Sequence, residues 1–170
     1  MAQIQFSGIQ LKWSNSVKYL GVLIDEKLKF DKHIKNVLQK ATGAKCSLFH
    51  LMNFRSPIPL RMRLYMYKTY IRPIIIYAGP AWSSNMSNST WKKLEVFQMK
   101  ILRMILGTHY YVSNKTILNS LQLETIQQII LTNTKQLIAS IENSPFEHIK
   151  TIIHSKSPKE HYLKKPLNIT

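Results

Sequence analysis

The carboxylates of this chain can be judged first, because two of them at the right separation could hold catalytic metal ions. The 170-residue sequence contains eight: Asp25, Glu26, Asp31, Glu95, Glu124, Glu142, Glu147 and Glu160. Only Asp25 and Glu26 are adjacent, and neighbouring side chains on a strand point to opposite faces. A solvated turn after a strand is the simpler interpretation of this pair. We therefore assign no catalytic residue to the chain.

The cysteine and histidine residues give little indication of a metal site. Cys46 and His50 are four residues apart on an expected helix, so both could face one metal ion. Zinc sites ordinarily need three or four protein ligands, and the other histidines follow no recognisable spacing. We predict no metal site and interpret Cys46 as a buried thiol. A single cysteine excludes an internal disulfide and favours an intracellular location, in the nucleus or the cytoplasm.

Composition points to a folded, strongly basic chain. Hydrophobic residues make up 45% of the sequence, enough for the core of one domain. Twenty-four Lys and Arg against eight Asp and Glu give a net charge of +16, which predicts a polyanionic partner. The longest apolar run, around Ile74 to Trp82, is interrupted by Pro80 and is too short to span a bilayer, so we expect no membrane segment.

Hydrophobic periodicity predicts a mainly α fold with a short N-terminal β hairpin. Alternation around Val17 to Asp25 indicates the hairpin, and breaker residues from Gly79 to Ser89 indicate a loop in which Trp82 is a core anchor. The expected helices are 31–52 with Asp31 as N-cap, a segment from Pro57 or Pro59 through Tyr70 that kinks near Pro73, a helix from a Ser89 cap to Gly107, 115–121 and 124–141. After Pro145 a basic, flexible tail is expected.

Two helices carry basic stripes. At helical spacing, Arg61, Tyr65, Lys68 and Arg72 fall on the face away from the apolar side chains. The later helix places Lys92, Lys93, Lys100 and Arg103 largely opposite its apolar face. Such stripes can neutralise phosphates, and Tyr65 could stack on a base or bond to a sugar. A solvated charged face is the competing interpretation.

Four sequence runs occur in an informative order. They are Val17 to Asp25, Tyr70 to Gly79, Trp82, and Phe97 to Gly107. In this order and at this separation, they resemble the C-terminal end of a reverse transcriptase from a jockey-like non-LTR retrotransposon, over roughly Ile9 to Ser144.

The resemblance implies a place in a polymerase. Lys18, Tyr19, Leu20 and Gly21 match the turn that supports the primer end, and the following helices match the thumb. The expected units are 1–28, residual palm strands with the primer-support hairpin; 29–144, a helical thumb-like bundle; and 145–170, the basic tail. The expected partners are an RNA/DNA template-primer duplex and the palm and fingers of the parent polymerase.

The family's paired aspartates lie upstream on a palm hairpin, where two metal ions stabilise attacking and leaving oxygens. This chain has no such pair, so we predict a truncated fragment of an RNA-directed DNA polymerase that is inactive alone. Cofactors are expected to be absent from this chain, with magnesium needed only by the intact polymerase. The alternative is a free-standing basic helical module that binds RNA or another protein.

Overall fold

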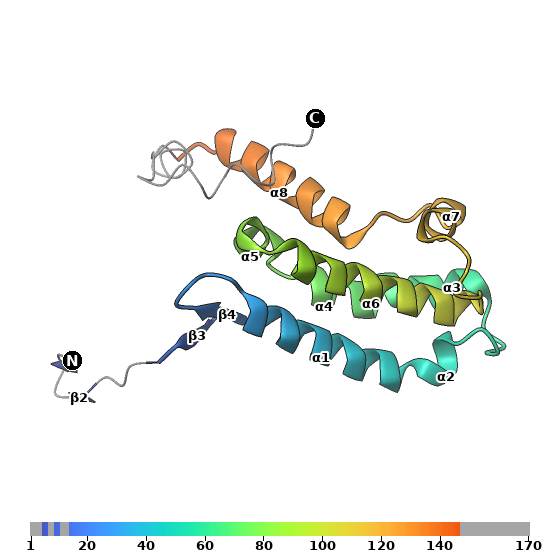
Figure 1. The fold of residues 1–170 in the computed structure, drawn as a ribbon. Helices are drawn as coiled ribbons and strands as arrows, with labels where there is room; N and C mark the ends of the chain where they lie inside the picture. Colours follow the sequence, from blue (N-terminus) through green and yellow to red (C-terminus); the bar gives the residue numbers. More distant parts are fainter. Residues whose placement is uncertain (1–4, 7–8, 11–13, 147–170) are drawn as a thin grey trace.

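Two short hairpins precede a bundle of helices in the computed structural model, which describes residues 5–6, 9–10 and 14–146 (Figure 1). Strand β1 (Gln5–Phe6) pairs antiparallel with β2 (Ile9–Gln10). Strand β3 (Ser16–Tyr19) pairs antiparallel with β4 (Val22–Asp25), with Tyr19 opposite Val22. The prediction of a mainly α fold with a short N-terminal hairpin is confirmed. The expected tail lies outside the described residues from position 147 onward.

The helices form three layers (Figure 1). In chain order they are α1 (Asp31–Ser47), α2 (Phe49–Met52), α3 (Leu60–Met66), the π-helical turn η1 (Tyr67–Ile71), α4 (Arg72–Ile76), α5 (Gly79–Trp82), the 3₁₀ turn η2 (Ser83–Asn85), α6 (Asn88–Leu106), α7 (Asn114–Ser120) and α8 (Ile126–Glu142). Helix α6 and the α3–η1–α4 segment form the middle layer, with α1 on one side and α8 on the other. The core therefore lies along both sides of the middle layer.

The α3–η1–α4 segment provides the centre of this core. Tyr67, Ile71 and Ile75 are all fully buried. Pro73 has no N–H group, and in a regular α-helix its ring would clash with the carbonyl four residues earlier. The π turn widens the helix just before that point, and the Arg72 N–H donates to the Tyr67 carbonyl across it. The irregularity predicted near Pro73 thus takes the form of a π turn that keeps the segment helical.

Helix α6 shows why its ends lie where they do. The Ser87 hydroxyl accepts a hydrogen bond from the Thr90 N–H at 3.2 Å, so Ser87 is the N-cap and the prediction of Ser89 was wrong by two residues. Gly107 ends the helix with φ +70°, as predicted. Helix α8 begins with a capping box between Thr125 and Gln128. The predicted apolar face of α6 is confirmed, and Leu94, Ile101, Leu102 and Ile105 on it are fully buried.

The start of α1 differs from the prediction. Phe30, with φ +58°, occupies the N-cap position, and no side chain caps the helix. Asp31 is already helical, and its carboxylate accepts a hydrogen bond from the Thr90 hydroxyl at 2.9 Å. Asp31 was expected to cap α1, and this bond instead links α1 to α6.

Two further expectations were wrong. The segment predicted as a loop after Tyr77 contains the short helical turns α5 and η2, which bring Trp82 into the core with no exposed surface. Burial of an indole supplies a large apolar area and orders the surrounding backbone. Cys46, predicted to be a buried thiol, is exposed because it lies on the solvent side of α1. The role of Trp82 as a core anchor is confirmed.

Substituting glycine by alanine at two sites should have opposite effects. A Cβ on Gly107 would lie 2.6 Å from the Phe54 ring in a left-handed conformation, so Gly107→Ala should lower the free energy of unfolding by about 1–3 kcal/mol. Gly43 is exposed within α1, and a methyl group there would meet no other atom within 4 Å. Gly43→Ala should therefore raise the free energy of unfolding by about 0.5–1 kcal/mol. Urea unfolding followed by circular dichroism measures both, and equal effects would contradict the packing at Gly107.

Candidate nucleic-acid interface

The β3–β4 hairpin presents the residues matched to primer support. Leu20 and Gly21 form its two-residue turn, with φ +44° and +85°. Two successive positive φ values characterise the type I′ turn that fits the twist of a tight hairpin. Tyr19 is 64% exposed and Leu20 is 74% exposed, so the turn projects into solvent. Lys18 is also exposed on β3.

Two long-range hydrogen bonds hold this hairpin on the helices. The Tyr77 hydroxyl, at the end of α4, donates to the Leu20 carbonyl at 3.0 Å. The Leu23 N–H donates to Nδ1 of His33 on α1 at 3.3 Å. A Cβ on Gly21 would lie 3.4 Å from the Tyr77 ring, so the turn and this tyrosine are in close contact. The exposed turn is therefore fixed relative to the bundle.

The stripe predicted on the second helix is only partly a surface feature. Arg61 and Tyr65 are exposed, whereas Lys68 and Arg72 are half-buried. Nε of Arg72 is buried without a hydrogen-bond partner among the described residues. Burial raises the pKa of the Tyr67 phenol to about 12, and the nearby Arg72 charge acts in the opposite direction. The π turn changes the helical phase after Met66, which explains why Arg72 is half-buried although regular helical spacing placed it on the surface.

The basic residues of α6 separate into two groups. Lys93 lies near its start, where it lines a cavity of about 500 Å³ with Lys32 and Lys35 of α1. Lys100 and Arg103 lie near its end and line a second cavity, of about 740 Å³. Neither cavity is lined by the predicted residues of the second helix, nor by Lys92. The structure therefore brings these predicted residues together only in part.

Sequence reasoning did not include Lys32, Lys35 or Arg55 among the candidate binding residues, although each lines one of the two cavities. The spacing of Lys32 and Lys35, three residues apart, places them on one face of α1. That spacing was available from the sequence. Only the packing of α1 against α6 shows that Lys93 joins this pair.

Some positive charges serve the fold. One Nη atom of Arg63 donates to the carbonyls of Asn53 and Ile105, at 3.1 and 2.7 Å. An Nη atom of Arg103 donates to the Val112 carbonyl at 2.6 Å. Since these guanidinium groups are partly buried and satisfy backbone oxygens, their charges are less available to a ligand. Arg103 was predicted to contact nucleic acid, and the structure gives it this internal bond.

The carboxylates also have internal partners. Asp25 accepts hydrogen bonds from the N–H groups of Lys29 and Phe30, at 3.2 and 2.8 Å. Burial alone acts to raise the pKa of Asp25, but these N–H groups and the charge of Lys32 bring it below its ordinary value. In the part of the chain that the structure describes, no three His, Cys, Asp or Glu residues gather as a metal site would require. No helix there has both the length and the apolar character needed to cross a membrane.

Comparison with known proteins shows that the chain is similar in sequence to RNA-directed DNA polymerases of mobile elements. The chain is 28% identical over 135 residues to the probable RNA-directed DNA polymerase from transposon BS of Drosophila melanogaster, a match covering 79% of this chain and 15% of that protein. It is 26% identical over 155 residues to the probable enzyme from transposon X-element of the same species, covering 91% and 17%. The corresponding protein of the mobile element jockey is 26% identical over 114 residues, covering 67% and 12%.

The chain's homologues are jockey-like retrotransposon RNA-directed DNA polymerases. The family resemblance drawn from the sequence runs is thereby confirmed. This chain spans less than a fifth of the length of the jockey-like relatives it matches. No protein-family model matches the sequence, and no solved structure matches the fold.

The attachment of the hairpin should depend on pH through His33. Burial, assisted by the charge of Lys40, lowers the pKa of His33 below its ordinary value of 6.5. Folding thus favours the neutral ring, whose Nδ1 accepts the Leu23 N–H, and protonation would turn that acceptor into a donor. Stability should therefore be complete above about pH 6.5 and fall as the pH drops from there through the folded-state pKa.

Urea unfolding at about pH 7.5 and pH 5.5 tests this dependence. His33→Asn keeps an acceptor near the Nδ1 position but cannot titrate in this range. We expect the variant to be less stable at the higher pH and to lose less stability on acidification than the unaltered chain. The remaining histidines are common to both proteins, so an identical loss in the two would exclude His33 as the source.

Proposed function

We propose that this chain holds the template-primer duplex of a jockey-like RNA-directed DNA polymerase. The observation that carries the proposal is the similarity to such polymerases over 79% and 91% of the chain. The hairpin, within 1–28, would lie beside the primer end, and the bundle, within 29–144, would act as the thumb. The net charge of +16 supports a polyanionic ligand.

The hairpin has the properties that primer support requires. Its turn is exposed at Leu20, yet the hydrogen bond from Tyr77 fixes it to the end of α4. A ligand held against such a turn loses less energy to loop ordering than one held by a free loop. Lys18 and Tyr19 would add a phosphate contact and a sugar or base contact beside it.

The helical surface supplies further cations without reading sequence. Arg61 and Lys92 are exposed, and Lys93 faces the same cavity as Lys32 and Lys35. Phosphate contacts of this kind position a duplex and depend on salt, because each neutralised phosphate releases counterions. Arg72 and Arg103 would contribute least, since Nε of Arg72 is buried and Arg103 donates to the Val112 carbonyl.

Binding to an RNA–DNA duplex across a salt series tests the grip. Arg61→Ala with Lys68→Ala should weaken binding and reduce the slope of log affinity against log salt by about 1 for each phosphate that is no longer neutralised. Arg72 is left unchanged because its Nε is buried. The matched control is Lys115→Ala with Lys135→Ala, which removes the same charge from exposed sites on α7 and α8. Equal slopes for the two double variants would exclude a localised duplex contact on α3–η1.

Catalysis would require carboxylates from outside this chain. Asp25 is committed to the backbone of Lys29 and Phe30, and Asp31 to Thr90. We therefore expect the purified chain, given magnesium ions, deoxynucleotides and a primed RNA, to bind the duplex without extending the primer. Gel analysis of a labelled primer measures this. Extension that persists through purification and disappears on replacing Asp25 would overturn the assignment of a purely binding role.

A further inference from the structure

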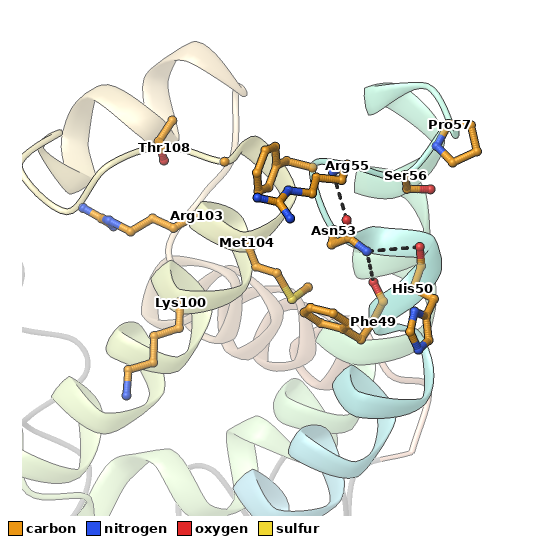
Figure 2. A pocket seen from close by; sticks show the side chains of 12 residues that line it. Phe49, His50, Asn53, Arg55, Ser56, Pro57, Lys100, Arg103, Met104 and Thr108 are labelled. Carbon is orange, nitrogen blue, oxygen red and sulfur yellow. Dashed lines mark hydrogen bonds between the residues drawn. The ribbon is translucent and has the colours of Figure 1, made fainter.

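The second cavity described above, lined by Lys100 and Arg103, is a groove at the end of the bundle that combines aromatic rings with positive charge. Its volume of about 740 Å³ is within the range of about 300–1,000 Å³ that is common for ligand sites. Phe49, His50 and Arg55 lie on one side, contributed by α2 and the following loop, and Lys100 lies on the other, on α6 (Figure 2). Met104 lies between the two sides, with the Phe49 ring directed toward it (Figure 2).

Two phenylalanines in the groove retain large exposed surfaces. Phe49 is 44% exposed and Phe54 is 52% exposed. The Arg55 guanidinium lies over the Phe54 ring, with its carbon 5.4 Å from the ring centre. A planar guanidinium supported by an aromatic ring offers a second flat surface on which a base can stack.

The charge of the groove is of one sign. Arg55, Lys100 and Arg103 line it, and no carboxylate is found among the described residues that do so. Arg103 donates to Val112, so Lys100 is the lining cation on α6 with no internal partner in the described part of the chain. A ligand that fits this lining must present flat apolar surfaces together with negative charge.

The segment directly after the groove extends the same character. Gly107 and Thr108 line the groove, and His109, Tyr110 and Tyr111 follow them. Tyr110 is 89% exposed and Tyr111 is 73% exposed. The rings of His109 and Tyr111 are stacked, 5.2 Å apart and inclined by 8°. Exposed rings in sequence with a basic groove are a recurring arrangement for binding unpaired bases.

We propose that this groove binds a single strand of nucleic acid, with bases stacked on Phe49 and Arg55 and a phosphate neutralised by Lys100. Unpaired bases are required because the faces of paired bases are covered by their neighbours in a duplex. The site is separate from the duplex contact assigned to Arg61 and Lys68, which do not line the groove. RNA and DNA single strands share the required chemistry.

Phe49 provides a matched pair of variants. Phe49→Leu keeps an apolar side chain against Met104 but removes the aromatic plane, whereas Phe49→Trp keeps a plane. Phe54 is left unchanged because its ring packs against Gly107. Arg55→Ala tests the guanidinium, and Lys135→Ala controls for loss of one charge at an exposed site on α8. Circular dichroism confirms that each variant is folded.

Binding to labelled oligouridylate of about ten nucleotides, measured by fluorescence anisotropy, is the first readout. We expect Phe49→Leu and Arg55→Ala each to weaken it about tenfold, Phe49→Trp to retain it, and Lys135→Ala to change it by less than about threefold. Phe49→Leu should leave RNA–DNA duplex binding unchanged. Oligothymidylate in parallel shows whether the groove prefers RNA, and either preference agrees with the shared chemistry.

Several outcomes would overturn the proposal. Equal single-strand binding by Phe49→Leu and the unaltered chain would exclude stacking at Phe49. Equal losses of single-strand affinity in Arg55→Ala and Lys135→Ala would show that Arg55 acts only through the net charge of the chain. Displacement of the labelled strand by oligoglutamate as efficiently as by unlabelled oligouridylate would indicate an acidic-peptide site instead. Because the duplex is measured separately, failure of the duplex grip would leave the result for the groove intact.

Discussion

The passage of one helical segment through the middle layer, despite a proline, is the constraint on which the rest of the structure depends. The segment from Leu60 to Ile76 must bury Tyr67, Ile71 and Ile75 between α1, α6 and α8. Ending the helix at Pro73 would remove Ile75 from the core, and burying a side chain of that size contributes about 1.5–3 kcal/mol. The π turn avoids this loss. Its second effect is on the surface, because the change of phase leaves the start of the stripe exposed and turns its end toward the core.

The same segment determines where the hairpin lies. Tyr77 follows α4 directly, and its hydroxyl and its carbonyl bond to two different parts of the chain. Its hydroxyl donates to the Leu20 carbonyl, while its carbonyl accepts the indole N–H of the buried Trp82 at 2.9 Å. Ala78 then adopts φ +51°, which allows α5 to begin at once. The packing of Trp82 in the core is thus connected through one residue to the exposed turn proposed to support a primer, which makes that turn part of a rigid unit.

Periodicity and stop signals predicted most of the helices, because those features act locally. The apolar face of α6 and its end at Gly107 follow from side-chain spacing and from the freedom of glycine at positive φ. The wrong predictions arise where a contact with a residue distant in the sequence determines the local structure. Asp31 bonds to Thr90 of α6 where it was expected to cap its own helix, and Arg72 is half-buried because the helix is widened before Pro73. The groove beside Phe49 depends on α2 and α6 meeting at their ends, which no local pattern encodes.

The arginines and lysines of this chain use their positive charges differently. One Nη atom of Arg63 joins two carbonyl oxygens, Ile105 on α6 and Asn53 at the end of α2. Arg103 makes a similar bond to Val112. Lys93 and Lys100, in contrast, lie exposed on α6. Net charge therefore overstates the number of phosphate contacts, since part of it stabilises the ends of helices. The arginine at position 55 is the exception, because its guanidinium lies over an exposed ring at the rim of a groove. Unlike the charges of Arg63 and Arg103, its charge therefore stays available to the single strand proposed for this groove.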